Sequence, residues 1–599
     1  MKQPLLTIEN LSVNFKSDNA ITHALENISF TVHKGEIVAI VGESGSGKSV
    51  TALSILQLLP APSANYVRGK IIFHDRDHIT DLLQLSQKEM ESIRGNLIAM
   101  IFQEPMTSLN PVQTCGSSVA EAIMLHKKVN SEKAKAQTVS LFKEVRLPDP
   151  ERIYKRYPHE ISGGQKQRVM IAMAMSCNPQ LLICDEPTTA LDVTVQKNIL
   201  LLLRSLQQQH HMSVIFISHD LGVVSEIADR IIVMYKGKIV EQGITKDILN
   251  NPEHYYTKAL LECRPTLHQK GERLPVVSDF MEAEEQKNKE QESRNKAQET
   301  SDQEENIQYS IFINQFSIEE RQTANLPSGS AVDKLQTLVS VDHLQVWFPS
   351  QKTFFGKVTA YTKAVDDVSF EIYKGETLGL VGESGCGKTT LGRALLGLIQ
   401  PTDGKIFFKN KETSEASSHE LRAMRKDMQI IFQDPYSSLN PRKKIGDAIA
   451  EPLKVHELFA TDKQRKEKVI ELLEKVNLSA NYYNRYPHEF SGGQRQRIVI
   501  ARALALEPSF VVCDESVSAL DVSVQAQVLN LLNDLKKEFD FTALFISHDL
   551  SVIRYISDRI MVMNKGVIEE TGLAEEVYNH PQKEYTKQLI ASIPGIVTI

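Results

Sequence analysis

The sequence is poor in cysteine, and it shows neither an excess of positive charge nor a long hydrophobic run. Six cysteines in 599 residues, with no CxxC pair, argue against a disulfide framework or a zinc site and fit a reducing compartment. The formal net charge of −7 gives no support for a protein that binds nucleic acid through attraction to phosphates. No run approaches about 18 uncharged apolar residues, and the first residues lead directly into a strand-like alternation. We therefore expect neither a transmembrane helix nor a signal peptide.

What the sequence does contain is a long internal repeat. GESGSGKS recurs as GESGCGKT, RYPHEISGGQKQR as RYPHEFSGGQRQR, and CDEPTTALDV as CDESVSALDV. From the SGGQ serines onward, Ser162 and Ser491, the offset is constant at 329 positions. Because a chain of this length is too long for one core, we predict a domain at residues 1–265, an acidic polar linker at residues 266–336 and a second domain at residues 337–599.

Each copy alternates short β-branched runs with helical patterns. EIVAIVG, QLLICDE and SVIFISHD are typical of buried strands, and helical patterns follow Lys48, Gly164 and Val193. This alternation predicts an α/β fold in each copy, with a mostly parallel sheet flanked by helices.

The two GxxxxGK[ST] stretches are typical of phosphate-binding loops, because each follows a predicted strand and opens a predicted helix. The glycines let backbone N–H groups turn toward phosphate oxygens, and the helix N-terminus adds positive potential. We expect Lys48 and Lys388 to reach the β- and γ-phosphates, and Ser49 and Thr389 to bind Mg²⁺. The predicted nucleotide-binding residues of the two loops are Gly42, Ser44, Gly45, Gly47, Lys48 and Ser49, and Gly382, Ser384, Gly385, Gly387, Lys388 and Thr389.

Two apolar strands, LLICDE and FVVCDE, each end in a pair of carboxylates. An acid at a strand end beside a nucleotide suits Mg²⁺ ligation, so we predict Asp185 and Asp514 as metal ligands. The next residue in each copy, Glu186 or Glu515, is placed to polarise an attacking water as a catalytic base.

A histidine and the SGGQ motif complete each set. His219 and His548 follow apolar strands in the same register, which favours a catalytic contact with the γ-phosphate over a structural role. Serine and two glycines before a helical pattern are typical of a capped helix start with exposed N–H groups, which is a second anion site. A single domain does not need two γ-phosphate sites. We therefore predict that the copies pair head to tail, with each ATP between the loop of one copy and the SGGQ helix of the other.

The order of these motifs resembles that of an ATP-binding cassette (ABC) ATPase, present twice. The phosphate loop, FQ loop, SGGQ, DE strand, ALD and SHD follow one another in each copy, and together they cover most of the chain. The resemblance implies two ABC ATPase domains, each with a mixed or parallel sheet core and a helical subdomain. It also implies that Gln103 and Gln433 contact Mg²⁺ and the attacking water, and that they couple the site to a partner.

The same resemblance gives roles to residues that the pattern alone does not explain. It implies that Phe15 and Phe348 stack on adenine, and that Asp192 and Asp521 communicate across the dimer. It also implies contacts from one copy to the ATP of the other by the residues of the two SGGQ motifs, Ser162, Gly163, Gly164 and Gln165, and Ser491, Gly492, Gly493 and Gln494.

Further motifs are similar to those of the ATPases that serve dipeptide, oligopeptide and nickel importers. These are FQ[ED]PxxSLNP, RYPHE[IF]SGGQ and the tails HYYTKALLE and EYTKQLIASIP. Such ATPases usually come as two chains, and the fused pair here most resembles the ATPase subunit of glutathione importers, with fused peptide and microcin importers as near neighbours. The resemblance implies a peripheral subunit on the cytoplasmic face of the bacterial inner membrane. Its partners would be two permease subunits and a periplasmic or lipid-anchored solute-binding protein, with no nucleic acid.

Two cysteines mark departures from the family pattern. Peptide-importer ATPases often carry a cysteine cluster for iron–sulfur after the YTKALL tail, but only Cys263 is present here, so we predict no iron–sulfur cluster. Cys386 replaces Ser46 in the second phosphate loop. At a helix N-terminus near Lys388 its thiol pKa is expected to fall, so that alkylation would block one ATP site.

The main alternative is a soluble tandem-cassette ABC protein that acts on ribosomes. Such proteins also have two cassettes and a charged linker, but their linkers need basic character to meet RNA, whereas this one is acidic. The importer-type motifs also oppose an exporter ATPase. Both copies keep every predicted catalytic residue, so we expect two working sites. The substrate is not encoded in this chain: glutathione, other di- or oligopeptides and nickel stay open.

Overall fold

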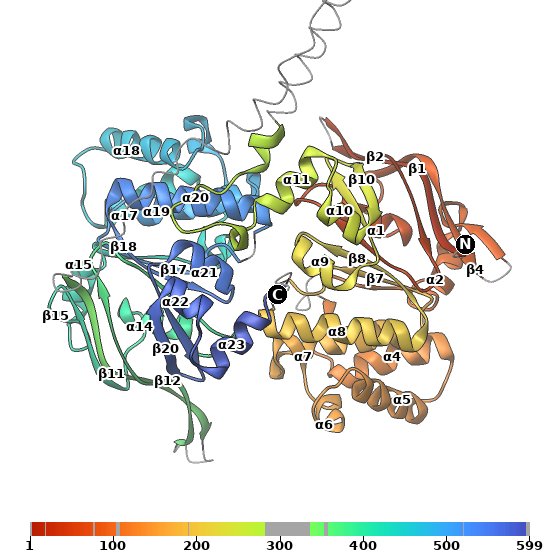
Figure 1. The fold of residues 1–599 in the computed structure, drawn as a ribbon, viewed down its shortest axis with the longest axis horizontal. Helices are drawn as coiled ribbons and strands as arrows, with labels where there is room; N and C mark the ends of the chain where they lie inside the picture. The colour runs from red at the N-terminus through yellow and green to blue at the C-terminus, as the bar shows by residue number, and fades with distance from the viewer. Residues whose placement is uncertain are drawn as a thin grey trace, which may run out of the picture.

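The computed structural model describes residues 3–17, 20–75, 78–103, 108–189, 191–281, 336–352, 358–518 and 520–594. The chain forms two α/β units of the same architecture, which Figure 1 shows next to each other. Each unit contains a four-stranded antiparallel sheet, a six-stranded mixed sheet and flanking helices. The predicted α/β fold with a mixed sheet core is confirmed for both copies.

The described residues of the first half form ten strands, β1 to β10, and the helices between and after them. The elements are β1 (Pro4–Ser17), β2 (Ala20–His33), β3 (Ile37–Val41), α1 (Lys48–Ile55), β4 (Ala64–Asp75), β5 (His78–Asp81), α2 (Gln87–Ile93), β6 (Ile98–Ile101), α4 (Cys115–Lys127), α5 (Ser131–Glu144), α6 (Pro150–Tyr154), α7 (Gly163–Met175), β7 (Leu181–Asp185), α8 (Val193–His210), β8 (Ser213–Ser218), α9 (Leu221–Ile227), β9 (Arg230–Tyr235), β10 (Lys238–Ile244), α10 (Thr245–Asn250), α11 (Tyr255–Glu262) and the 3₁₀ helix η3 (Pro265–Leu267).

The second half repeats this order. Its elements are β11 (Thr337–Lys352), β12 (Val358–Tyr373), β13 (Thr377–Val381), α14 (Lys388–Leu395), β14 (Asp403–Phe408), β15 (Lys411–Glu412), α15 (Ser418–Met424), β16 (Met428–Ile431), α16 (Pro435–Ser438), α17 (Ile445–Val455), α18 (Asp462–Lys475), α19 (Gly492–Leu504), β17 (Phe510–Asp514), α20 (Val522–Phe539), β18 (Thr542–Ser547), α21 (Leu550–Ile556), β19 (Arg559–Asn564), β20 (Val567–Leu573), α22 (Ala574–Asn579) and α23 (Glu584–Ala591).

The six-stranded sheet explains the continuous apolar runs in the sequence. Its strand order in the first half is β10-β9-β3-β8-β7-β6, parallel except for β10, and the second half has the equivalent order. Every residue of β3, β7 and β8 is buried, because the sheet is covered on both faces. The pleat sends Ala39 and Val41 into one hydrophobic cluster, and Val38 and Ile40 into another. Because β3, β7 and β8 run parallel, their carboxyl ends lie at the same edge of the sheet, where a ligand site is expected.

The two halves point in opposite directions. In Figure 1, helices α4 to α7 lie at the lower end of the first half, whereas α17 to α19 lie at the upper end of the second half. In each half, the phosphate loop directly precedes a helix, α1 or α14, and follows a strand of the six-stranded sheet, β3 or β13. This orientation is the one expected for a head-to-tail pair.

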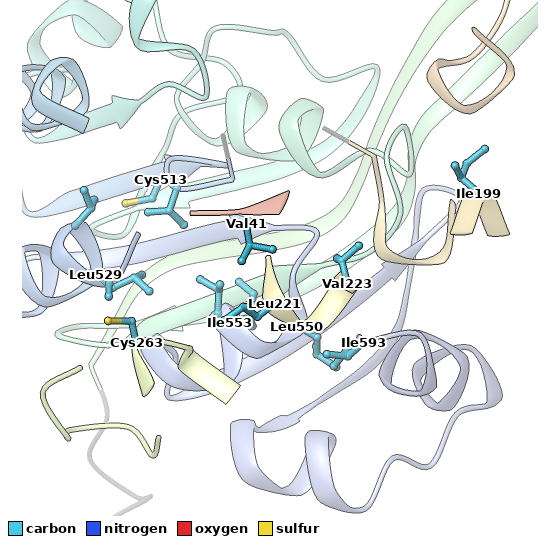
Figure 2. Close-up of a cluster of buried hydrophobic side chains, with 14 of the residues drawn as sticks. Val41, Ile199, Leu221, Val223, Cys263, Cys513, Leu529, Leu550, Ile553 and Ile593 are labelled. Atoms are coloured by element: carbon cyan, nitrogen blue, oxygen red, sulfur yellow. The ribbon is translucent and has the colours of Figure 1, made fainter. Parts of the chain in front are cut away.

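A buried hydrophobic cluster continues from one half into the other. It includes Leu221 of the first half and Leu550 and Ile553 of the second half, all at most 2% exposed. Figure 2 shows these residues together with Cys263 and Ile593, which follow the last helix of each half. The contact between the halves is thus a shared apolar core as well as a polar interface.

The predicted linker begins against the second half. Residues 266–281 are described, and Leu274 among them is fully buried in the shared cluster. The rest of the predicted linker, residues 282–335, lies outside the described residues. The domain bounds at residues 265, 266, 336 and 337 stay predictions. In the described ranges, no helix is both long enough and apolar enough to span a membrane.

Candidate functional site

The phosphate loop of each half connects a buried strand to a helix. The loop after β3 leads to α1, and Gly47, which directly precedes that helix, has φ of 104°. A Cβ at Gly47 would lie 2.7 Å from Leu25 Cδ2 and 3.0 Å from the Ala24 carbonyl oxygen. At Gly387, with φ of 113°, a Cβ would lie 2.0 Å from the Ala364 carbonyl oxygen. Only glycine fits these two positions, and the following helix turn presents its free N–H groups to an anion.

A buried lysine lies inside each loop. Lys48 Nζ donates hydrogen bonds to the carbonyl oxygens of Gly42 (2.7 Å) and Glu43 (2.8 Å), and Lys388 makes the equivalent bonds at 2.7 and 2.9 Å. Burial lowers the pKa of Lys48, and the carboxylates around it, Glu186 first, oppose this shift. An ammonium group held in this way is placed to meet phosphate charge at the mouth of the loop.

The predicted metal ligands of each half lie next to each other. Ser49 Oγ donates to Asp185 Oδ1 at 3.1 Å, and Thr389 Oγ1 donates to Asp514 Oδ1 at 2.9 Å. Burial raises the pKa of both aspartates, and the charge of the neighbouring glutamate, Glu186 or Glu515, also raises it. A hydroxyl and a carboxylate beside a phosphate loop form the donor set that Mg²⁺ takes together with nucleotide phosphates, so these residues fit that ion.

A glutamate, a glutamine and a histidine converge beside this pair. Glu186 Oε2 accepts hydrogen bonds from Gln103 Nε2 at 3.1 Å and Thr189 Oγ1 at 2.9 Å, and lies 3.3 Å from His219 Nδ1. In the second half, Glu515 Oε2 lies 2.7 Å from Gln433 Nε2 and 3.5 Å from His548 Nδ1. The structure therefore brings together the residues predicted as catalytic, three in each half. The predicted contact of the two glutamines with Mg²⁺ stays a prediction.

The two glutamates are held ionised by their histidines. Burial alone would raise the pKa of Glu186, but the hydrogen bond and charge of His219 outweigh it and lower that pKa to about 2. Burial would likewise lower the pKa of His219, but Glu186 raises it. The pKa values of Glu515 and His548 shift in the same directions for the same reasons. An ionised carboxylate at this place can accept a proton from an attacking water.

Both glutamates also have a strained backbone. The φ angles of Glu186 and Glu515 are 47° and 46°, in the left-handed region that residues other than glycine rarely adopt. Strain of this kind concentrates at functional sites, where the surrounding structure holds the residue in place. Here the N–H groups of Glu186 and Glu515 bond to the carbonyl oxygens of Ile217 and Ile546 at 3.0 Å, which ties each turn to the neighbouring strand.

Each phosphate loop is bonded to the opposite half. Asp521 Oδ2 accepts a hydrogen bond from the N–H of Ser44 at 2.8 Å, and Asp192 Oδ1 accepts one from the N–H of Ser384 at 2.6 Å. A cavity of about 140 Å³ lies between the halves and is lined by equivalent residues from both, including His219 and His548. The two aspartates of the ALD motifs thus contact the loops across the interface.

The SGGQ serines cap the helices α7 and α19. The N–H of Gln165 donates to Ser162 Oγ at 3.3 Å, and Gln165 Oε1 accepts from the N–H of Ser162 at 3.0 Å; Ser491 and Gln494 form the same capping box. Both serines are exposed. Their contact with a nucleotide, and that of Gly163 and Gly492, stays a prediction.

The second glycine of each SGGQ motif is required by packing. A Cβ at Gly164 would lie 2.8 Å from Val195 Cγ1, and a Cβ at Gly493 would lie 2.3 Å from Val524 Cγ1. These valines belong to α8 and α20, which follow the ALD aspartates. The close approach places the start of the SGGQ helix against the helix that carries the contact to the opposite loop.

The two predicted adenine-stacking aromatics occupy equivalent places on the antiparallel sheets. Phe15 lies on β1 opposite Thr22, and Phe348 lies on β11 opposite Thr362. Phe15 is half-buried against the core, whereas Phe348 is 42% exposed. Stacking of either ring on adenine stays a prediction.

Sequence reasoning missed a tyrosine that supports each loop. Tyr256 Oη accepts a hydrogen bond from the N–H of Glu43 at 2.8 Å, and Tyr585 Oη accepts one from the N–H of Glu383 at 3.1 Å. Burial raises the pKa of both phenols, so they stay neutral. Both tyrosines could have been found in the sequence, because each begins the YTK stretch of its tail. In the sequence analysis these tails were used only as evidence for the family.

The expected fall in the thiol pKa of Cys386 is wrong. Cys386 is 6% exposed, and burial raises its pKa, although the charge of Lys388, with Nζ 3.9 Å from the sulfur, opposes the rise. The hypothesis that alkylation of this thiol blocks one site loses its chemical basis. Cys263 is also buried, which raises its pKa to about 12, and the absence of an iron–sulfur cluster stays a prediction.

Comparison with known proteins agrees with this geometry. The model of the ABC transporter family matches residues 25–189 and 365–518, and that of the oligopeptide/dipeptide transporter C-terminal region matches residues 240–290. The first match covers more than half of the chain. The fold and the site define a pair of nucleotide-binding units. The chain belongs to the ABC transporter family and carries two of its ATP-binding ATPase cassettes.

Among curated relatives, the glutathione import ATP-binding protein GsiA of Escherichia coli (strain K12) is 45% identical over 596 residues. The GsiA of Pectobacterium atrosepticum is 44% identical over 592 residues. Both alignments cover 98% of this chain and 89% of the relative, so the resemblance to these ATPases is confirmed. Solved structures that match include the ADP- and phosphate-bound dimer of the cassette MJ0796 (27% identity, TM-score 0.36, 40% of this chain and 99% of that chain). Another is cbiO1 from Clostridium perfringens (24% identity, TM-score 0.36, 41% and 92%).

Proposed function

We propose that this chain is the ATP-hydrolysing subunit of an ABC importer that takes up glutathione or another small peptide. Two observations support an importer of this class. The similar curated proteins are named for glutathione import, and residues 240–290 match the C-terminal region of oligopeptide and dipeptide transporters. Nickel remains a further substrate that the wider family resemblance allows.

The observation that carries the enzymatic part is the complete set of site residues in both halves. In the first half, Lys48 binds the phosphates, Ser49 and Asp185 hold Mg²⁺, and Glu186 takes a proton from the attacking water. When bound, Mg²⁺ neutralises charge on the phosphate oxygens. His219 keeps Glu186 ionised and oriented. The second half repeats each contact, so both sites hydrolyse ATP.

The contacts between the halves support shared sites. Each phosphate loop is bonded to an aspartate of the other half, so the opposite half forms one wall of each site. We infer that the SGGQ helix of that half closes over the γ-phosphate, because it begins at the SGGQ glycines and the first N–H groups of a helix have no partner within the helix. The repeated loop then has a simple reason, since one chain supplies both halves of each site.

Exposed hydrophobic side chains support docking on membrane permeases. In the first half, Val112, Leu125 and Tyr157 are 79%, 72% and 40% exposed around α4 and the start of the SGGQ region. In the second half, Tyr436 and Phe459 are 65% and 42% exposed at the equivalent end. Single exposed apolar residues are ordinary, but Val112 and Tyr436 come shortly after Gln103 and Gln433 of the FQ loops in the chain, and exposed apolar side chains there are suited to a protein partner. We infer two permease subunits at these ends, on the cytoplasmic face of the inner membrane, with a solute-binding protein that delivers substrate.

A pull-down from detergent-solubilised membranes of the host tests this function. We expect two multi-span permeases to copurify with the tagged chain, and ATP-driven uptake of labelled glutathione or a short peptide after reconstitution with its solute-binding protein. The matched control is the chain with Glu186→Gln and Glu515→Gln, which should copurify but not support uptake. Recovery of ribosomal proteins and RNA without permeases would overturn the importer and favour a translation-related ABC protein.

A further inference from the structure

Residues 264–281, here called the clasp, follow the last helix of the first half and lie on the second half. The clasp begins after α11, includes η3, and contacts α21 through η3. Figure 1 shows this part of the chain crossing from α11 to α20 and α21. From residue 266 onward it belongs to the segment that the sequence predicts as an acidic polar linker.

Hydrogen bonds between buried side chains and the clasp backbone hold it in place. The N–H of Leu274 donates to Asn530 Oδ1 at 3.0 Å, and Asn530 Nδ2 donates to the carbonyl oxygen of Leu274 at 2.8 Å. Tyr555 Oη donates to the carbonyl oxygen of Glu272 at 2.7 Å. Leu274, Asn530 and Tyr555 are 0%, 5% and 1% exposed. Removing the clasp would leave the amide of Asn530 without these partners and would expose a leucine, so detachment is costly.

Ion pairs surround this buried centre. Lys270 pairs with Asp558, and Arg273 lies 3.3 Å from Asp534. These side chains are more than a third exposed, so the pairs orient the clasp and add little to its stability. The arrangement, with a buried apolar and hydrogen-bonded centre and a charged rim, is that of a specific protein interface.

Among the described residues, the two side chains that bind the clasp backbone have no equivalent on the first half. At the 329-position offset, Asn530 and Tyr555 correspond to Leu201 and Glu226 of the first half. Leu201 is 56% exposed on α8, and neither residue can make the amide and phenol contacts that the clasp uses. The difference indicates that this surface is shaped for the clasp and is not a by-product of the repeat.

A smaller contact runs in the opposite direction. Lys197 Nζ of the first half donates to the carbonyl oxygen of Ala591 at 2.7 Å, and a Cβ at Gly222 would lie 3.1 Å from the Pro594 carbonyl oxygen. Ile593 is 6% exposed and belongs to the shared cluster. Figure 2 shows it among the side chains of this cluster. Each half thus places the residues after its last helix on the other half, and the clasp is the larger of the two contacts.

We propose that the clasp keeps the two cassettes together while the nucleotide sites are open. Its contacts involve neither phosphate loop nor SGGQ motif, so they do not require nucleotide. The helix that leads into the clasp carries Tyr256, which supports the first phosphate loop. The cassettes therefore separate at the ATP sites by pivoting about this contact, without dissociating. The inference rests on the pairing of the cassettes in the proposed function.

Cutting the covalent connection tests the clasp directly. A specific protease site is inserted between residues 290 and 330 of the full chain, the purified protein is cut without nucleotide, and association is measured by size-exclusion chromatography and analytical ultracentrifugation. We expect the two halves to stay together. If they separate without nucleotide but reassociate with ATP, the pairing stands and the clasp is overturned. If a cut chain with Glu186→Gln and Glu515→Gln does not associate even with ATP, the pairing itself fails.

Variants assign the association to the clasp. We expect Asn530→Leu combined with Tyr555→Phe to raise the dissociation constant of the cut halves by at least about tenfold, because three hydrogen bonds to the clasp are lost. Leu274→Asp, a change in the clasp itself and outside both sheets, should do the same. Leu201→Asn, the mirror exchange on the first half, is the matched control and should change nothing. Unchanged association in both the double variant and Leu274→Asp overturns the proposal.

Discussion

The two halves have equivalent residues at their predicted nucleotide sites, but they differ at the surface that receives the clasp. Glu186 lies 3.1 Å from Gln103 Nε2 and Glu515 lies 2.7 Å from Gln433 Nε2, each with a histidine beside it. By contrast, Asn530 of the second half stands where the first half has Leu201. Two hydrolytic sites, as proposed, need the same chemistry twice, whereas the proposed clasp is needed only once. The difference shows which parts of the repeat are constrained by chemistry and which by assembly.

The similarity of the two sites is tested most strongly by replacing their catalytic glutamates, Glu186 and Glu515. We expect Glu186→Gln and Glu515→Gln each to lower ATP hydrolysis at its own site by about 100-fold or more, because the base that accepts the proton of water is lost. The two single variants should have equal effects in a steady-state ATPase assay, and the double variant should be inactive. Asp534→Asn, on the clasp side, is a control for surface charge. A single variant with full activity would mean that one site does not work.

The difference between the halves is tested by two single variants, Asn530→Leu and Leu201→Asn, each of which introduces the residue of the other half. Asn530→Leu removes two hydrogen bonds to the clasp backbone, which we expect to lower the free energy of unfolding by about 1–3 kcal/mol. Leu201→Asn changes an exposed residue and should have an effect close to zero. Denaturant unfolding of both variants gives the comparison. Equal effects of the two exchanges would contradict the assigned asymmetry.

The histidine–glutamate pairs predict a pH dependence of the nucleotide-free protein. Glu515 raises the pKa of His548, so the stability contributed by His548 is complete below its ordinary pKa of 6.5 and is lost as pH rises through the higher folded-state value. Glu515, with a pKa lowered from 4.5, contributes above that value and loses its contribution only in more acidic solution. We expect His548→Gln to destabilise the protein at pH 6, by on the order of 1 kcal/mol, and much less at high pH.

The same measurement on His219→Gln sharpens the comparison, because the pKa of His219 is raised by Glu186 in the same way. Thermal unfolding from pH 6 to pH 9 shows both dependences. A difference from wild type that grows with pH, in either half, would contradict the assigned pairing.

The smallest effect is expected at Cys386. Because this thiol is buried and its pKa is raised, iodoacetamide should leave it unlabelled in the folded protein at pH 7. Cys386→Ser, which copies Ser46 of the first half, should not change ATP binding. Mass spectrometry of the labelled protein checks the first statement and nucleotide titration checks the second. Rapid labelling, or a changed affinity in the variant, would restore a special role for this thiol.

The nucleotide site was accessible from the sequence because its chemistry demands residue types at fixed places. Asp185 ends β7 and His219 follows β8, and these parallel neighbours have their carboxyl ends at the same edge of the sheet, so the strand patterns were enough to predict that the two residues lie close together. The fold class followed from the same strands. The head-to-tail arrangement was expected from the second anion site at the SGGQ helix, whereas a role for Asp521 across the interface required the family resemblance, and its partner Ser44 came from the structure.

The clasp could not be predicted for physical reasons. Residues 266–281 contain a glycine, a proline and apolar residues such as Leu274, Val276 and Val277, but they adjoin the polar, charged run after residue 281, which is typical of a tether. Their position depends on backbone groups bound by Asn530 and Tyr555, far along the chain, and backbone groups leave no trace in a sequence pattern. The sign of the pKa shift at Cys386 was wrong for a related reason, since burial decides it and exposure is not written in the loop motif.

The most direct test of two equivalent sites between the halves is the number of ATP molecules held by the chain with Glu186→Gln and Glu515→Gln. Equilibrium binding of labelled ATP with Mg²⁺, followed by rapid gel filtration, counts the nucleotides that stay bound. We expect two ATP per chain, because each half supplies a complete loop and contacts the loop of the other. One ATP per chain would contradict it, and would mean that one of the two repeated loops does not bind nucleotide.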